Sequence, residues 1–174
     1  FISFERKILN NLKLTTMMPV DKNVICTNAF DNENLDNVLG QVISNHNLSQ
    51  LRIAETEKYA HVTYFFDGGK ELSLKNCKKI LIPSEKVATY DLKPEMSANK
   101  ITDELLKELE NKPDLVVLNY ANGDMVGHTG VYEKAIIAVE TVDKCIKRII
   151  DNIDLSEYTV IITADHGNCE QMIN

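Results

Sequence analysis

Three features are scarce or missing in this sequence: an excess of basic residues, long apolar runs and closely spaced cysteines. Lys and Arg number 19 against 26 Asp and Glu, which gives a formal net charge of −7 at pH 7. A chain with this balance and no basic stripe argues against nucleic acid or an anionic membrane as a partner. No apolar run approaches the roughly 20 residues that a membrane-spanning helix needs.

The four cysteines, Cys26, Cys77, Cys145 and Cys169, are scattered without CxxC spacing. This distribution predicts free thiols in a reducing compartment, and it argues against a disulfide framework or a zinc knuckle. The first residues carry neither a signal nor a transit peptide pattern. The expected location is therefore cytoplasmic.

What remains is an ordinary globular composition of 174 residues, 44% hydrophobic and 26% charged. Such a length suffices for one sizeable core, or for one domain with an appendage. The Asn- and Asp-rich stretch 28–34 predicts a linker or domain boundary.

The hydrophobic pattern predicts alternating strands and helices. A helix with apolar residues from Ala135 to Ile150 stands between two apolar runs at 115–120 and 159–163, which indicates a strand–helix–strand unit. Such a unit predicts a parallel sheet with a right-handed crossover, so the fold class is α/β, a mostly parallel sheet flanked by helices. Further strands are expected at 12–18, 24–26, 62–66 and 79–82, and further helices at 35–43 and around 105–109, the latter ending before Pro113.

Each strand of that unit is followed by one carboxylate and one imidazole: Asp124 and His128 after the first, Asp165 and His166 after the second. The carboxyl ends of parallel strands meet at one edge of the sheet, where ligands bind in such folds. Mixed oxygen and nitrogen donors suit manganese or zinc. Since each ion needs about four to six ligands, these residues predict two half-built sites.

Four segments closely resemble cofactor-independent (2,3-bisphosphoglycerate-independent) phosphoglycerate mutase, in the order that family has them. The resemblance runs from about residue 12 to the end of the chain. The segments are Gln50–Thr63, Lys86–Ala98, Asn119–Gly130 and Thr163–Asn168.

The resemblance implies an alkaline-phosphatase-like metalloenzyme that interconverts 3-phosphoglycerate and 2-phosphoglycerate in glycolysis through a phosphoserine intermediate. By motif, Asp124 and His128 would bind one divalent ion, and Asp165 and His166 a second. The usual metal is Mn2+, with Mg2+, Co2+ or Zn2+ as alternatives. Lys58 would be the catalytic cation that contacts the phosphoryl group. The full-length protein is expected to be a cytoplasmic monomer.

Several family features cannot be identified here: the nucleophilic Ser, a further Asp ligand, the substrate arginines and a late His ligand. The chain therefore resembles a carboxy-terminal fragment, incomplete at both ends and expected to be inactive alone. Residues 1–30 would be the end of an inserted phosphotransferase domain with its linker. Residues 31–174 would be the truncated carboxy-terminal half of the phosphatase-like metal-binding domain.

Other functions remain open: a phosphopentomutase or phosphatase of the same superfamily, or an inactive fragment that acts only as a binding module. Several residues near the motifs also have two interpretations. Glu55 and Glu57 could form ion pairs with Lys58 or be solvated charges. His61 could make a structural hydrogen bond or bind metal, and Arg52 could touch substrate or brace the site. Asn122 and Asn168 are expected to shape their loops.

Overall fold

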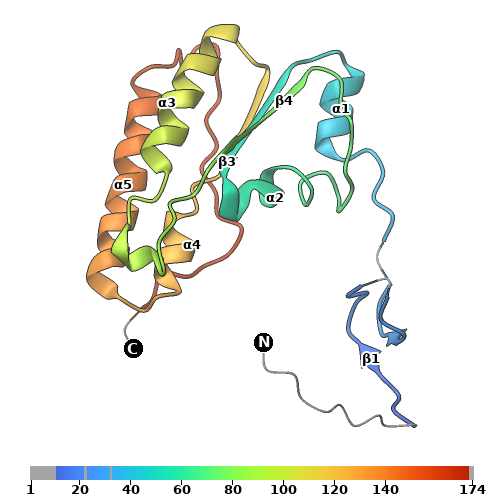
Figure 1. Ribbon diagram of the computed structural model, residues 1–174. Coiled ribbons are helices and arrows are strands. Elements are labelled where there is room, and N and C mark those ends of the chain that lie inside the picture. Colours follow the sequence, from blue (N-terminus) through green and yellow to red (C-terminus); the bar gives the residue numbers. More distant parts are fainter. Residues whose placement is uncertain (1–10, 22, 32, 173–174) are drawn as a thin grey trace. The chain divides into compact units, whose positions relative to one another are not determined.

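A computed structural model describes residues 11–21, 23–31 and 33–172 (Figure 1). Contacts divide the chain into two compact units, one within residues 1–35 and the other within 36–174. In the first unit, β1 (Thr15–Thr16) pairs in parallel with β2 (Thr27–Asn28). The predicted strand at 12–18 thus shrinks to two residues. The strand predicted at 24–26 is wrong, because Ile25 is fully open to solvent and pairing begins only at Thr27.

The second unit contains a parallel three-stranded sheet in the order β4–β3–β5, so the predicted α/β class is confirmed. The central strand β3 (Gln50–Glu55) has β4 (Cys77–Ile82) on one side and β5 (Leu115–Leu118) on the other. Gln50 lies opposite the first residue of each neighbour. All three carboxyl ends therefore meet at one edge.

Helices cover both faces of this sheet. Figure 1 shows α3 and α5 together on one side and α1 on the other. The helices are α1 (Leu39–Asn45), α2 (Tyr59–Val62), α3 (Ala98–Glu108), α4 (Asn122–Gly127) and α5 (Tyr132–Ile150), with short 3-10 helices at Thr56–Lys58, Tyr90–Leu92 and Leu109–Asn111. No helix in the described ranges is long and apolar enough to cross a membrane.

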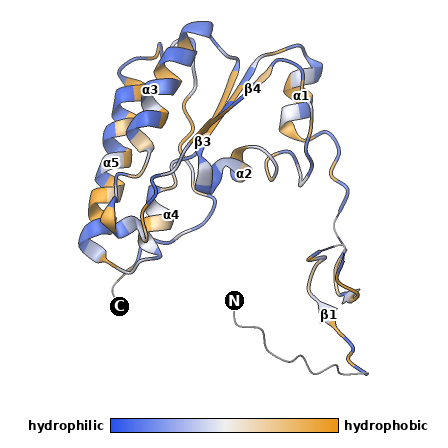
Figure 2. Ribbon diagram, viewed as in Figure 1, coloured by the Kyte–Doolittle hydropathy of each residue, from blue (hydrophilic) through white to orange (hydrophobic). Residues whose placement is uncertain are grey.

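Strand β3 is buried along its whole length, but its two faces differ because side chains alternate. Leu51 and Ile53 face α3 and form an apolar core with Ile101 and Leu105. The opposite face carries buried polar groups, beginning with the Gln50 amide, which donates to the Gly40 carbonyl of α1 (2.8 Å). Both β3 and β4 accordingly mix hydrophobic and hydrophilic residues, as α3 and α5 do (Figure 2).

The strand predicted at 62–66 is wrong. Val62 ends α2, and turns follow it. The cause is the buried Arg52 guanidinium on β3, since the Val62 carbonyl accepts its hydrogen bond (3.2 Å) and the Phe66 ring stacks on it at 4.2 Å. A segment that contacts one guanidinium through both Val62 and Phe66 cannot be extended. The hydrogen bonding of buried Arg52 therefore outweighs the β propensity of these residues.

The strand predicted at 159–163 is also wrong: this segment pairs with no other described strand. A cavity of about 1280 Å³ lies between it, β5 and α5. Ile161 and Ile162 remain 82% and 66% exposed. A strand forms only where its backbone can hydrogen-bond to a neighbouring strand. Among the described residues, the segment 159–163 has no such neighbour, so the second strand of the predicted strand–helix–strand unit does not form.

Truncating a side chain in the core between β3 and α3 should lower the stability of the protein. Leu105→Ala should lower the free energy of unfolding by about 2–5 kcal/mol, because Leu105 is 3% exposed and its removal leaves a cavity. Leu155→Ala makes the same chemical change at a side chain that is 61% exposed, and it should cost about 0.5 kcal/mol or less. Urea unfolding followed by circular dichroism measures both, and equal costs would contradict the assignment of this core.

Candidate functional site

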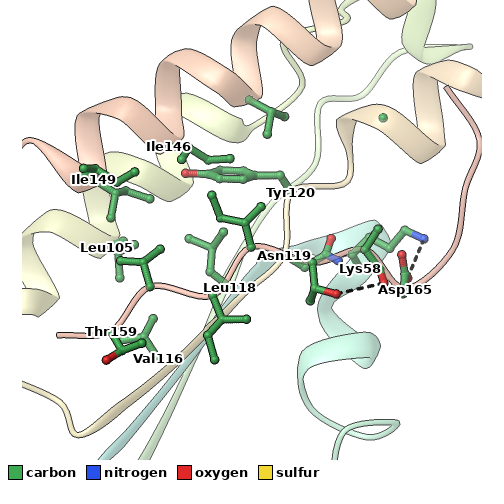
Figure 3. Close-up of a pocket in the computed structure, with 18 of the residues that line it drawn as sticks. Lys58, Leu105, Val116, Leu118, Asn119, Tyr120, Ile146, Ile149, Thr159 and Asp165 are labelled. Carbon is green, nitrogen blue, oxygen red and sulfur yellow. Dashed lines mark hydrogen bonds and ion pairs between the residues drawn. The ribbon is translucent and has the colours of Figure 1, made fainter. Parts of the chain in front are cut away.

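The candidate site lies at the carboxyl edge of the sheet, where two charged side chains meet. Lys58 stands in the 3-10 turn after β3, and Asp124 stands on α4, which follows β5. The Lys58 ammonium forms an ion pair with the Asp124 carboxylate and lies 3.9 Å from an oxygen of Asp165. Figure 3 shows Lys58 and Asp165 together at one end of the cavity, whose other end is apolar. The Lys58 side chain is only 6% exposed, so this ion pair is shielded from solvent.

Two imidazoles also face Asp124. The Nε2 atom of His128, four residues later on the same helical path, lies 3.0 Å from Asp124 Oδ1. The Nε2 atom of His166 lies 3.8 Å from Asp124 Oδ2 and 3.7 Å from an oxygen of Asp165. The structure therefore brings together all four predicted metal-binding residues and Lys58.

Asn168 holds Asp124 in place. Its side-chain amide donates to both the backbone carbonyl and Oδ1 of Asp124, each at 3.0 Å. Partial burial by itself would raise the pKa of Asp124, but the hydrogen bonds from Lys58 and Asn168 and the positive charge of Lys58 outweigh it and lower that pKa. Asp124 is thus kept as an anion, the form that binds a cation.

The donor set fits a divalent cation in kind but not in number. Two carboxylates and two imidazoles are suitable ligands. Within residues 11–172, apart from positions 22 and 32, no three His, Cys, Asp or Glu side chains form a group that could hold an ion. Asn119, at the end of β5, lines the same cavity and has a buried Oδ1 without a hydrogen-bond partner. Sequence patterns did not single out Asn119, since an Asn after a strand is an ordinary turn residue.

Of the two roles left open for Glu55 and Glu57, ion pairing with Lys58 or a solvated charge, Glu55 has neither, whereas Glu57 is exposed in its 3-10 turn and is a solvated charge. Glu55 is fully buried and accepts hydrogen bonds from the Ser84 hydroxyl (2.9 Å) and the Ser97 amide (3.3 Å). Burial raises the pKa of Glu55, although these two hydrogen bonds oppose the shift. Glu57 accepts a hydrogen bond from the Tyr90 hydroxyl (2.7 Å). No ion pair joins either residue to Lys58 in the described structure.

The structure also shows the surroundings of Arg52 and His61. Arg52 is fully buried and donates to Gln50 Oε1 (2.7 Å), so it braces the fold and cannot reach a ligand. His61 packs edge-on against Phe65 at 5.2 Å between ring centroids. Its Nδ1 is buried without a hydrogen-bond partner, so the structural hydrogen bond expected for this residue is not formed at that atom.

Comparison with known proteins gives the class to which this fold and site belong. The model of the metalloenzyme superfamily matches residues 9–174, and the chain belongs to that superfamily. All of the chain aligns with the 2,3-bisphosphoglycerate-independent phosphoglycerate mutase of Clostridium acetobutylicum at 57% identity, and 99% of it with that of Helicobacter pylori at 48% identity. It covers 34% and 35% of these proteins, so it spans about a third of the length of the curated relatives it matches.

A solved structure supports the same relationship. The crystal structure of Leishmania mexicana phosphoglycerate mutase at low cobalt concentration matches with a TM-score of 0.80 and 30% identity. The match covers 90% of this chain and 29% of that one. The resemblance to cofactor-independent phosphoglycerate mutase that the sequence motifs indicate is therefore confirmed.

Two glycines of α4 test the support of Asp124. A Cβ added at Gly127 would lie 2.6 Å from Asn168 Oδ1 and 3.0 Å from Cys169 Sγ, whereas at Gly123 it would meet nothing within 4 Å. Gly127→Ala should displace Asn168 from Asp124 and destabilise the protein by about 1–3 kcal/mol, the cost of leaving polar groups unpaired. Gly123→Ala should be neutral or stabilising by up to about 1 kcal/mol. Calorimetric unfolding distinguishes them, and a harmless Gly127→Ala would contradict this role of Asn168.

Proposed function

We propose that this chain forms part of the two-metal active site of a cytoplasmic phosphoglycerate mutase. That enzyme would interconvert 3-phosphoglycerate and 2-phosphoglycerate in glycolysis. The observation that carries the proposal is the meeting of Lys58, Asp124 and Asp165 at the carboxyl edge of the sheet, in a chain 57% identical to such a mutase. The substrate is a small phosphorylated anion, which an acidic protein binds only where cations line the site.

In this proposal Asp124 and His128 hold one divalent ion, and Asp165 and His166 hold the other. When bound, such ions, most often Mn2+ by resemblance, would supply positive charge for the transferring phosphoryl group and would activate a hydroxyl nucleophile. Lys58, already buried beside both carboxylates, binds a phosphoryl oxygen. Asn168 orients Asp124 toward the site.

The nucleophile of this reaction lies elsewhere in the proposed whole-length enzyme. No serine lines the cavity beside Lys58 among the described residues. A serine from another part of the whole-length protein, phosphorylated and dephosphorylated in turn, completes the reaction in this proposal, and so do the substrate arginines. Residues 1–30 are proposed to end the phosphotransferase domain, and residues 31–174 to form half of the metal-binding domain of a monomer.

The metal requirement is the first test. The whole-length protein should lose mutase turnover in a chelator and regain it with Mn2+. In that protein His128→Ala should lower turnover by roughly 10²–10³-fold, because charge stabilisation of the phosphoryl group is lost.

His46→Ala is the matched control, since His46 is an exposed histidine after α1, away from the site. It should leave turnover unchanged. A coupled assay with 3-phosphoglycerate, run beside a simple phosphate ester, separates mutase from phosphatase. Full turnover in metal-free protein, or hydrolysis of the ester alone, would overturn the proposed function.

The 174 residues expressed alone should show no mutase turnover and only weak Mn2+ binding. Four ligands divided between two ions leave each with about two, against the three or four that hold catalytic zinc-type sites. The open cavity beside β5 and the exposed Ile161 and Ile162 should also make the isolated chain prone to association. Turnover above a chelated control would show that a serine within this chain serves as the nucleophile.

A further inference from the structure

The segments that carry Lys58 and Asp124 are both tied to one stretch of chain. This stretch is the β4–α3 connection (residues 83–97), which leads from the end of β4 to the start of α3. It includes the short 3-10 helix Tyr90–Leu92. It contributes no side chain to the cavity that contains Lys58 and Asp124.

On the Lys58 side the tie is the buried Glu55 carboxylate, three residues before the lysine. Glu55 Oε2 accepts from the Ser84 hydroxyl (2.9 Å), and Oε1 accepts from the Ser97 amide (3.3 Å), so one carboxylate joins both ends of the connection. Ser97 is the residue before the first turn of α3, where a negative charge is favoured. The Ser84 amide also donates to the hydroxyl of Thr56 (3.1 Å).

On the Asp124 side the tie is the amide of Asn122, two residues before the aspartate. Asn122 is fully buried, and its Nδ2 donates to the carbonyls of Pro94 and Glu95, both at 2.9 Å. Around these hydrogen bonds Met96 of the connection packs in one apolar cluster with residues of α4 and α5. Buried polar groups with their partners are costly to displace, so both ties are rigid.

We propose that Glu55 and Asn122 are positioning residues: through the β4–α3 connection they set the separation of Lys58 and Asp124. The turn that carries Lys58 follows β3, and the helix that carries Asp124 follows β5. Each of these segments is hydrogen-bonded to the β4–α3 connection. Errors of about 1 Å in such a separation cost on the order of 10²-fold in rate. The proposal rests on the proposed function for its turnover measurements and has a second readout in metal binding.

The first experiment uses the whole-length protein and a double-mutant cycle with Lys58. Glu55→Ala should lower turnover by about 10- to 100-fold, as expected for a misplaced catalytic cation. In a Lys58→Ala background the same change should cost less than about twofold, because two residues acting through one group are not additive. Glu55→Gln should keep turnover within about threefold, since a glutamine can accept from the Ser97 amide and donate to the Ser84 hydroxyl.

Gln50→Ala is the matched control for lost stability. Gln50 lies on the same strand and is 2% exposed. It accepts from Arg52 and donates to a backbone carbonyl of α1, so its loss also destabilises β3, but at the end of the strand opposite to Lys58. Its effect on turnover should be the same, and small, with or without Lys58. Equal losses for Glu55→Ala in both backgrounds, or loss of turnover in Glu55→Gln, would overturn the positioning role of Glu55.

The second experiment measures Mn2+ affinity by electron paramagnetic resonance of the free ion. Asn122→Ala should weaken binding by about tenfold, as residues that orient metal ligands do, and Gln50→Ala should not. Unchanged affinity in Asn122→Ala would overturn its role. If the unsubstituted protein binds Mn2+ but has no mutase turnover, the proposed function fails, and the Mn2+ titration still decides whether Asn122 positions Asp124.

Discussion

Parallel pairing of β3 with both of its neighbours is the constraint on which the site depends. Because β4, β3 and β5 run in one direction, the segments that follow β3 and β5 leave the sheet at the same edge. Lys58 and Asp124 are 66 positions apart in the sequence and still form a shielded ion pair there. An antiparallel arrangement of the same strands would send the two segments to opposite ends of the sheet.

The site also requires a rigid β3, and the two faces of this strand are held in place by different kinds of contact. The face toward α3 is held by apolar contacts among Leu51, Ile53, Ile101 and Leu105, which need only volume and shape. The opposite face holds the Arg52 guanidinium, whose burial is compensated by hydrogen bonds and by the Phe66 ring. Removing one partner from such a network leaves a buried charge uncompensated, so that face specifies its neighbours more strictly.

Charge balance connects the fold to the proposed chemistry. Asp124 and Asp165 lie within reach of one lysine and two histidines, so their negative charge is held in place. This arrangement suits a phosphorylated anion only when further positive charge is present, as the metalloenzyme superfamily provides. The β4–α3 connection adds a structural support, because it binds both the segment that carries Lys58 and the segment that carries Asp124, which no hydrogen bond of the sheet joins directly.

The sequence by itself determined the class of the fold, the strand at 79–82, most of the strand expected at 115–120, the long helix ending at Ile150 and the motifs that carry the site residues. These follow from local periodicity and from short-range chemistry, which a pattern contains. Tertiary structure alone decided that 62–66 curls around Arg52 and that 159–163 joins no strand. It also decided that Glu55 and Asn122 form hydrogen bonds with the β4–α3 connection. Each of these outcomes depends on partners far away in the chain, and the spacing of residues along a sequence does not encode such partners.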